Sequence, residues 1–308
     1  MTAMGLMLTA CGGSSQSGSN PLPPLSPPPA GKYFTHIVIL VQENRTFDNL
    51  FATFPGADGT TVGKTRNGTR KLQEAALNTP VDLNNAYSYW QQDCDAAQSG
   101  RCKMDGFNTV ENGGVRGTYV YRYVDPSQIR PYWDMARQYV LADHFFQTQG
   151  SGSFTAHQDL IRGGTNLNDS VSLIDQPTGS PWGCDGPLGT VTSLITTANH
   201  YEHDSGPFPC LTYSTLRDLL DGVGISWRYY APPVGDNTGG DNWNAFDAVK
   251  AVRYSPEWSV NIAWPETKVF ADVDRGSLPG VSWVIPDLQN SDHPGQGSDT
   301  GPSWVPRS

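Results

Sequence analysis

The fold class is decided by residues 35–48, which read THIVILVQENRTFD. The first seven residues are an apolar, largely β-branched run, typical of a strand buried on both faces of a parallel sheet. Aromatic and aliphatic residues then recur at helical spacing through Phe54, so we expect a short helix that begins near Thr46. Open α/β folds place their ligand sites among polar residues at the carboxyl end of such a strand.

Further strands and helices alternate along the chain. We expect helices over 131–140, 154–162, 216–220 and 242–252, and strands over 140–146, 225–230 and 281–285. Residues 55–125 are rich in Gly, Asn and Asp and indicate a long ordered loop region, and His36 is expected to be a packed core histidine of the first strand. The alternation predicts an α/β fold with a mainly parallel central sheet, flanking helices and long ordered loops.

The composition excludes several classes of protein. There are 30 Asp and Glu against 20 Lys and Arg, which gives a formal net charge of -10. An acidic surface repels phosphate backbones, so we expect no nucleic-acid partner. With 9 Trp, 13 Tyr and 11 Phe the chain can build a core, and no apolar run reaches the ~18 residues of a membrane span.

The N-terminal residues look like an export signal rather than part of the fold. Residues 1–11 end in Leu8-Thr9-Ala10-Cys11, which resembles a bacterial lipobox and predicts lipid attachment at Cys11. No Lys or Arg precedes Lys32, although signal peptides begin with a basic segment, so we interpret 1–11 as a signal remnant; an ordinary apolar start is the alternative. Residues 12–31 form a Gly/Ser/Pro-rich tether. Residues 32–308 would then be an exported domain, periplasmic, cell-surface or extracellular, held to a membrane by the lipid.

Four further cysteines fit an exported protein. Cys94, Cys102, Cys184 and Cys210 allow three pairings, and we predict the local ones, Cys94–Cys102 and Cys184–Cys210. Each bridge would stabilise the domain by roughly 2–4 kcal/mol. Free thiols in a cytosolic protein are the alternative, and a zinc site is disfavoured because the sequence has no CxxC pair.

Ser153 is the best candidate nucleophile. It follows a Gly/Ser turn at the start of a predicted helix, where backbone N–H groups and the helix dipole favour an anion. His157 lies four residues further on, on the same helix face. The alternative is structural, because Ser is a frequent N-cap residue.

Two further polar groups follow predicted strands. Glu43 supplies a carboxylate, a hard oxygen ligand for a divalent cation, and Asn44 supplies an amide that can donate to phosphoryl oxygens. The alternative is a helix-start cluster in which Asn44 or Thr46 is the cap. Asp292 and His293 follow the strand over 281–285 and could lie on the same rim of the sheet, or in a surface turn.

A second pair of histidines is less informative. His200 and His203 are three residues apart and could form a metal pair, but they lie close to Pro207 and Pro209. This context favours a solvated loop.

Together these segments resemble the bacterial phosphoesterase family that contains secreted phospholipases C and acid phosphatases, within the alkaline-phosphatase-like superfamily. The resemblance covers nearly all of residues 33–305. It rests on ordered blocks at 36–51, 54–59, 141–146, 152–158, 181–185, 227–233, 278–287 and 291–295.

The resemblance implies a role for each candidate residue. Glu43 would be a ligand of a divalent metal ion, and Asn44 would contact the bound phosphoryl group. Ser153, beside the cation, would attack phosphorus to form a phosphoseryl intermediate. His157 and His293 would contact the phosphoryl or leaving-group oxygens.

The family pattern continues where this sequence ends. Past the block at 301–305, family members continue into a further sheet-and-helix half with a Trp-Asp-Asp motif that completes the metal site. This sequence ends at Ser308, and Trp133-Asp134 is followed by Met135. The resemblance therefore implies a fold that is incomplete on its C-terminal side. We expect weak or absent activity and an exposed apolar sheet edge.

The function implied is hydrolysis of phosphoric esters by a Ser nucleophile and a divalent metal. The acidic charge and the block at 181–185 favour the acid-phosphatase-like members over phospholipases C, which act on phospholipid head groups. A non-catalytic surface lipoprotein fragment is the alternative from another class.

Overall fold

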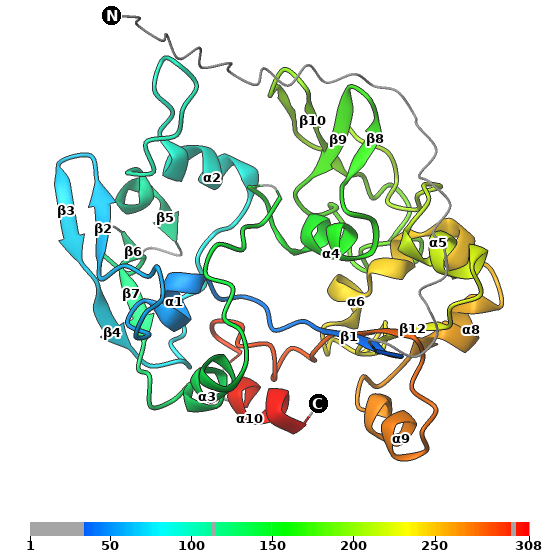
Figure 1. Ribbon diagram of the computed structural model, residues 1–308. Helices are drawn as coiled ribbons and strands as arrows, with labels where there is room; N and C mark the ends of the chain where they lie inside the picture. Colours follow the sequence, from blue (N-terminus) through cyan, green and yellow to red (C-terminus); the bar gives the residue numbers. More distant parts are fainter. Residues whose placement is uncertain (1–33, 113–114, 117, 149, 297–299, 308) are drawn as a thin grey trace, which may run out of the picture. The chain divides into compact units, whose positions relative to one another are not determined.

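A four-stranded parallel sheet organises the fold (Figure 1). The computed structural model describes residues 34–112, 115–116, 118–148, 150–296 and 300–307. The strand order is β1-β14-β12-β13, with β1 at Ile37–Leu40, β14 at Val281–Val284, β12 at Trp227–Tyr230 and β13 at Ile262–Ala263. Each neighbouring pair is parallel, so the predicted mainly parallel α/β sheet is confirmed.

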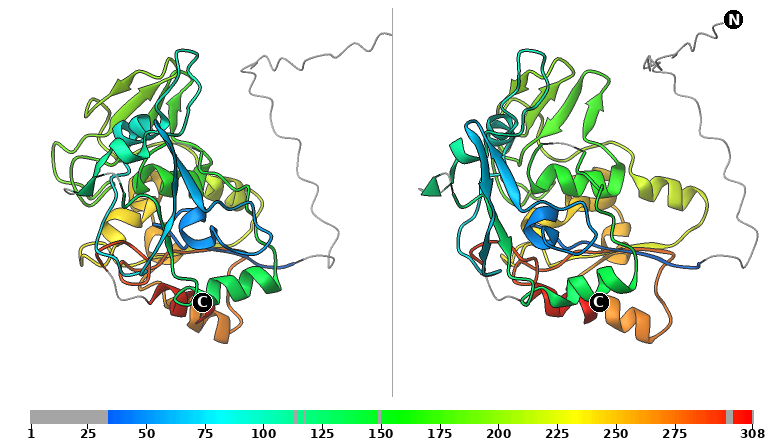
Figure 2. Two further views of the ribbon diagram at one scale, coloured as in Figure 1. Left: turned by 90° about the vertical axis from the view of Figure 1, so that its left-hand side faces the viewer. Right: turned by 60° about the vertical axis from the view of Figure 1, so that its left-hand side comes forward.

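Helices cover both faces of this sheet (Figures 1 and 2). On one face, α4 and a short 3-10 helix, η2, contribute Ile161 and Phe246 to the cluster that contains Trp283 and Tyr229. On the other face, α9 and α10 pack over Tyr230 and Val284. Adjacent strand residues point to opposite faces, which explains why Tyr229 and Tyr230 belong to different clusters. The helices span α1 Phe47–Phe51, α2 Tyr87–Cys94, η1 Phe107–Thr109, α3 Arg130–Gln138, α4 Ser153–Arg162, α5 Leu216–Gly222, α6 Gly240–Trp243, η2 Ala245–Ala248, α7 Lys250–Arg253, α8 Glu257–Asn261, α9 Lys268–Asp274, α10 Gly301–Trp304 and η3 Val305–Arg307.

The first strand is less buried than its sequence predicts. Ile37 and Val38 are 44% and 46% exposed, because among the described strands β1 pairs with β14 alone and lies at the edge of the sheet. The strand that is buried along its whole length is β14. His36 is also not a core residue; it is exposed just before β1, and its Nδ1 lies 2.9 Å from the carbonyl oxygen of Pro279.

The remaining strands form smaller sheets that the sequence did not indicate. A four-stranded antiparallel sheet has the order β11-β10-β9-β8, and three two-stranded sheets lie between residues 62 and 124. Their bounds are β8 Asn166–Asn168, β9 Val171–Ile174, β10 Ser193–Thr196, β11 Tyr201–Glu202, β2 Val62–Thr65, β3 Gly68–Lys71, β4 Gln73–Ala75, β7 Arg122–Val124, β5 Glu111–Asn112 and β6 Val115–Arg116.

Two predicted elements are wrong in whole or in part. Residues 140–146 form no strand, and Val140 and Phe145 are 90% and 86% exposed. Polar contacts hold this segment instead: Asp143 accepts the Asp58 N–H at 2.9 Å, and His144 lies 2.8 Å from the Asp58 carboxylate. The predicted helix over 242–252 is broken into α6, η2 and α7.

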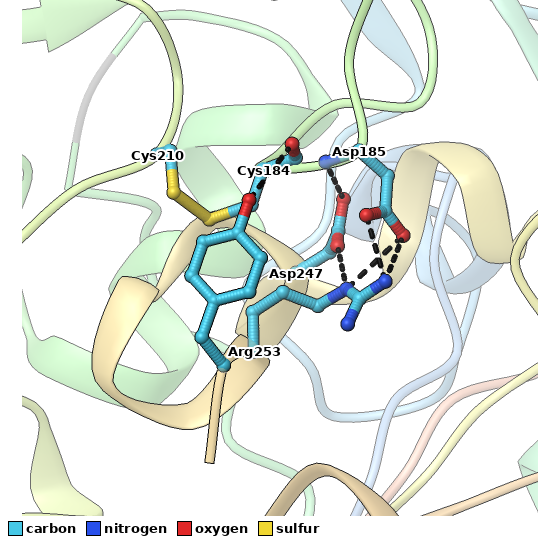
Figure 3. The surroundings of a disulfide bond; sticks show 6 residues. Cys184, Asp185, Cys210, Asp247 and Arg253 are labelled. Atoms are coloured by element: carbon cyan, nitrogen blue, oxygen red, sulfur yellow. Dashed lines mark hydrogen bonds and ion pairs between the residues drawn. A yellow bond between two sulfur atoms is a disulfide. The ribbon is translucent and has the colours of Figure 1, made fainter.

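Both predicted disulfides are present, Cys94–Cys102 and Cys184–Cys210. The second lies beside a charged cluster, shown in Figure 3, in which Arg253 points at both Asp185 and Asp247. The Arg253 guanidinium lies 2.8 Å from Asp185 Oδ1 and 3.3 Å from Asp247 Oδ1. The bridge joins the loop at 184–185 to Cys210, and the ion pairs connect Arg253 of α7 to that loop and to η2.

Removing the two bridges should have unequal costs. The Cys184–Cys210 bridge closes a sequence separation of 26 residues and Cys94–Cys102 one of 8. Loop-closure entropy then predicts losses of about 3.5 and about 2.5 kcal/mol on double replacement by Ala. Urea unfolding of the two double variants measures both, and a larger loss for the shorter loop would contradict the entropic account.

Stability should decrease as the pH rises from about 4 to about 7. Burial, with help from the charge of Asp185, raises the pKa of Asp247 to about 7, although Arg253 acts in the opposite direction. Between these two pH values the carboxyl of Asp247 is protonated in the folded state, whereas in the unfolded chain, with a pKa of about 3.9, it is ionised. The free energy of unfolding therefore falls as the pH rises. We expect a difference on the order of a few kcal/mol between pH 4 and 7 from this group.

Thermal unfolding of wild type and Asp247→Asn at pH 4.5 and 7.5 tests this expectation. The variant should lose less stability between the two pH values than wild type does. An identical pH dependence in both proteins would show that Asp247 ionises normally.

The N-terminal predictions lie outside the described residues. These are the signal remnant with Cys11 and the tether over 12–31. Within the described part of the chain, none of the helices has the length and apolar character needed to cross a bilayer.

Candidate active site

The polar residues that follow β1 contact the helix that begins at Ser153. The Oε2 of Glu43 lies 3.1 Å from Nε2 of His157, and both side chains are largely buried. The other atoms of the pair, Glu43 Oε1 and His157 Nδ1, are buried without a hydrogen-bond partner among the described residues. Unsatisfied buried polar atoms are costly, and they often mark a site that binds something.

Asn44 and Arg45 connect this strand end to the segment that follows β14. Asn44 has a positive φ of 71° and donates from Nδ2 to the Ser291 carbonyl oxygen at 3.0 Å. Arg45 donates from Nε to the carbonyl oxygen of Asp292 at 2.8 Å and from Nη2 to that of Leu77 at 2.6 Å. Because β1 and β14 are parallel neighbours, their carboxyl ends meet at one rim, as the sequence predicts.

Ser153 does not cap its helix, so the structural alternative for this residue is wrong. The N-cap of α4 is Gly152, with extended backbone angles, and Ser153 is the first helical residue. No side-chain capping bond is present at this helix start. The hydroxyl of Ser153 therefore lies at the N-terminus of α4, four residues or about 6 Å along the helix axis from the His157 position.

An aromatic side chain that sequence reasoning missed links the two candidate histidines. The Trp243 ring stacks on His157 with centroids 6.3 Å apart and an angle of 18°, and it lies 6.4 Å from the His293 ring. Trp243 is the last residue of α6 and is buried. Nothing in the local pattern distinguishes it from a core residue, because its role depends on helices that are far apart in sequence.

The Asp292 side chain is held away from solvent. Its Oδ2 accepts a 2.7 Å hydrogen bond from the hydroxyl of Tyr132 in α3. Burial, with the nearby negative charge of Asp292, raises the pKa of Tyr132 far above its usual value. Burial also lowers the pKa of Arg45, which remains a cation beside Asp292. Asp292 and Arg45 therefore stabilise the rim, and His293 follows directly.

The described residues supply only part of a binding site for a divalent cation. The buried, unpartnered Oε1 of Glu43 is the kind of hard oxygen that such a cation prefers. Among the described residues there is no group of three or more His, Cys, Asp or Glu that could hold a metal ion. Glu43 can therefore supply one ligand of a coordination sphere that needs several more oxygens.

The other singled-out polar residues lie apart from this rim. His200 and His203 are exposed and contact Glu202 and Asp204, as a solvated loop predicts. The structure thus brings together four segments that carry Glu43–Asn44, Ser153–His157, Trp243 and Ser291–His293.

Comparison with known proteins places the chain in a family. The Phosphoesterase family matches residues 34–308. The non-hemolytic phospholipase C of Pseudomonas aeruginosa is 28% identical over 291 residues, which cover 87% of this chain and 37% of that protein. Phospholipase C B of Mycobacterium tuberculosis is 27% identical over 296 residues, covering 84% of this chain and 51% of the relative.

A third relative also matches most of this chain over a minority of its own length. The hemolytic phospholipase C of Pseudomonas aeruginosa is 24% identical over 305 residues, which cover 88% of this chain and 39% of that protein. The chain therefore spans between about a third and a half of the length of these relatives.

Proposed function

Because the chain belongs to the Phosphoesterase family, we propose that its site transfers a phosphoryl group from a phosphate ester to Ser153. The observation that carries the proposal is the contact between Glu43 and His157, one helical turn from the Ser153 hydroxyl. It joins a carboxylate and an imidazole from two distant segments, and the imidazole belongs to the helix that begins at Ser153.

The reaction would proceed in two steps. Oγ of Ser153 attacks phosphorus, the ester P–O bond breaks, and the alcohol leaves with a proton. Water then attacks phosphoserine and releases phosphate. The N-terminus of α4 stabilises the negative charge that accumulates on the phosphoryl oxygens.

The surrounding residues would orient the phosphoryl group. The imidazoles of His157 and His293, held by Trp243, would donate to its oxygens from two sides, and Asn44 would contact it at the end of β1. A divalent cation bound through Glu43 would neutralise charge on the ester and acidify the attacking hydroxyl. Phosphoryl transfer depends mainly on such positioning and charge neutralisation.

The substrate would be a phosphate monoester or, in the alternative, a phospholipid. With a phospholipid, Ser153 would accept the phosphorylated head group, diacylglycerol would leave, and water would release the phosphorylated head-group alcohol. The acidic charge and the block at 181–185 resemble the acid-phosphatase-like members, which act on monoesters, whereas the relatives named above are phospholipases C. Parallel assays with p-nitrophenyl phosphate and p-nitrophenylphosphorylcholine, each with a divalent metal and with chelator, separate the two. Faster metal-dependent release from the choline ester would identify the phospholipase C alternative.

A third outcome distinguishes the non-catalytic alternative. If neither substrate is turned over and neither phosphorylates Ser153, the proposed reaction is excluded for this chain. A surface protein that retains the family fold would then be the better description.

The site of action would be outside the cytoplasm. Two disulfides are typical of exported proteins. Attachment to a membrane through a lipid on Cys11 would complete this arrangement, and mass spectrometry of the protein from its host membrane fraction tests for that lipid.

A further inference from the structure

Asp175 is a buried carboxylate that the proposed reaction does not use. It follows β9 directly, is 6% exposed, and has a positive φ of 56°. Its Oδ1 accepts from the Tyr87 N–H at 2.7 Å and from the Ser151 hydroxyl at 3.1 Å. Its Oδ2 accepts from the Tyr201 hydroxyl at 2.8 Å. Three segments of the chain therefore converge on one side chain.

The contact with Ser151 is reciprocal. The backbone N–H of Asp175 donates to Oγ of Ser151 at 2.7 Å, while that hydroxyl donates to the Asp175 carboxylate. Hydrogen bonds to an ionised carboxylate are stronger than neutral ones. The two bonds fix the position of Ser151 and of the backbone that follows it.

Ser151 lies two residues before Ser153, in the turn that starts α4. The next residue, Gly152, is closely enclosed, since a Cβ there would lie 3.1 Å from Oδ1 of Asn85. The helix start has no side-chain cap of its own, and Thr155 donates back to the Gly152 carbonyl oxygen at 3.1 Å. The bonds between Ser151 and Asp175 are thus the main side-chain restraint on this turn among the described residues.

We propose that Asp175 is a positioning residue, which holds Ser151 so that the Ser153 hydroxyl points at the reacting phosphoryl group. The inference rests on the proposed function. Asp175 acts through Ser151 and does not touch the substrate. Burial and the bond to Asp175 raise the pKa of Tyr201 to about 12, so Tyr201 stays a donor and keeps the carboxylate oriented. A displacement of about 1 Å in a reacting group can reduce a rate roughly 100-fold.

The chain offers a matched control for this arrangement. Ser193 and Asp204 make the same reciprocal pair, with the Asp204 N–H donating to Ser193 Oγ at 2.9 Å and that hydroxyl lying 3.3 Å from Asp204 Oδ1. Asp204 also has a positive φ, of 51°. This pair belongs to the antiparallel sheet and makes no hydrogen bond to residues 151–153 in the described contacts. Ser193 also hydrogen-bonds to Tyr201, so Ser193→Ala perturbs Tyr201 but leaves both Ser151–Asp175 bonds in place.

The experiment compares Ser151→Ala, Asp175→Ala and Asp175→Asn with Ser193→Ala in the full chain. The readouts are the single-turnover rate of Ser153 phosphorylation by p-nitrophenyl phosphate, amide hydrogen exchange of residues 152–157, and Tm. We expect Ser151→Ala to slow phosphorylation about 10- to 100-fold and to speed exchange in the first turn of α4, with a change in Tm similar to that of Ser193→Ala.

The two changes at position 175 should differ. Asp175→Ala should slow phosphorylation at least as much as Ser151→Ala does. Asp175→Asn should retain most of the rate, because the amide oxygen still accepts from Ser151 and Tyr87, and Asn tolerates a positive φ.

Failure of the inference can be told from failure of the proposed function. If wild type forms phosphoserine and Ser151→Ala forms it as fast as Ser193→Ala, Asp175 has no positioning role. If wild type forms no phosphoserine, the proposed function is overturned together with the positioning role of Asp175. The exchange data then still show whether the Ser151–Asp175 bonds hold the turn.

Discussion

Replacement of Ser153 by Ala should reduce the single-turnover release of p-nitrophenol from p-nitrophenyl phosphate by about 1,000-fold or more. Loss of a nucleophile removes the covalent route and leaves only the residual effect of binding and charge stabilisation. The fold should be unaffected, because Ser153 is the first residue of α4 and does not cap the helix. An acid quench followed by mass spectrometry should find phosphate on Ser153 in wild type and not in the variant.

The control for this prediction is Ser170→Ala. Ser170 is exposed in the turn between β8 and β9, away from the rim that carries Glu43 and His157. It should leave the rate and the phosphoserine signal unchanged. Equal rates in wild type and Ser153→Ala would exclude Ser153 as nucleophile, even if the chain hydrolyses the ester.

Replacement of Glu43 by Gln should reduce the rate about 100-fold or more and abolish its dependence on divalent metal. Gln has nearly the same shape, but it lacks the charge that a hard cation prefers in its ligands. The change also removes the negative partner of His157, 3.1 Å away. Isothermal titration calorimetry with Mn²⁺, Zn²⁺ and Ca²⁺ should show weaker binding, and rate measurements over a range of metal concentrations should lose their rising phase.

An exposed glutamate provides the comparison. Glu74→Gln, on the surface of β4, removes the same charge from the chain without touching the rim. It should retain metal binding and rate. If Glu43→Gln binds metal as tightly as Glu74→Gln does, the assignment of Glu43 as a ligand is wrong, and its role is confined to the contact with His157.

The fold class could be predicted from local pattern. The apolar run at β1, the alternation at β12 and the run at β14 predicted strands that the structure contains, and helical spacing predicted α1 and α3. The predictions of local elements that were wrong failed because tertiary contacts overrode the local pattern. Residues 140–146 have the composition of a strand, but Asp143 and His144 contact Asp58 and no described strand pairs with them.

The site was predictable as a set of chemical types at strand ends and a helix start. A carboxylate after β1, a hydroxyl at the first residue of α4 and a histidine after β14 are visible in the sequence, since each follows a local signal. The segments that carry them meet because β1 pairs with β14 in parallel and α4 packs over that sheet.

Sequence alone predicted β1, β12, β14, the start of α4 and the types of chemical group that stand at Glu43, Ser153, His157 and His293, because these depend on neighbours within one or two turns of the chain. It also predicted both disulfide pairings. Only the tertiary structure decided that β1 is an edge strand among the described strands, that the Trp243 ring contacts both histidine rings, and that Asp175 binds Ser151. These relations join residues tens to hundreds of positions apart. Packing sets the burial and the direction of the side chains that make these contacts. The periodicity of the local sequence does not specify that packing.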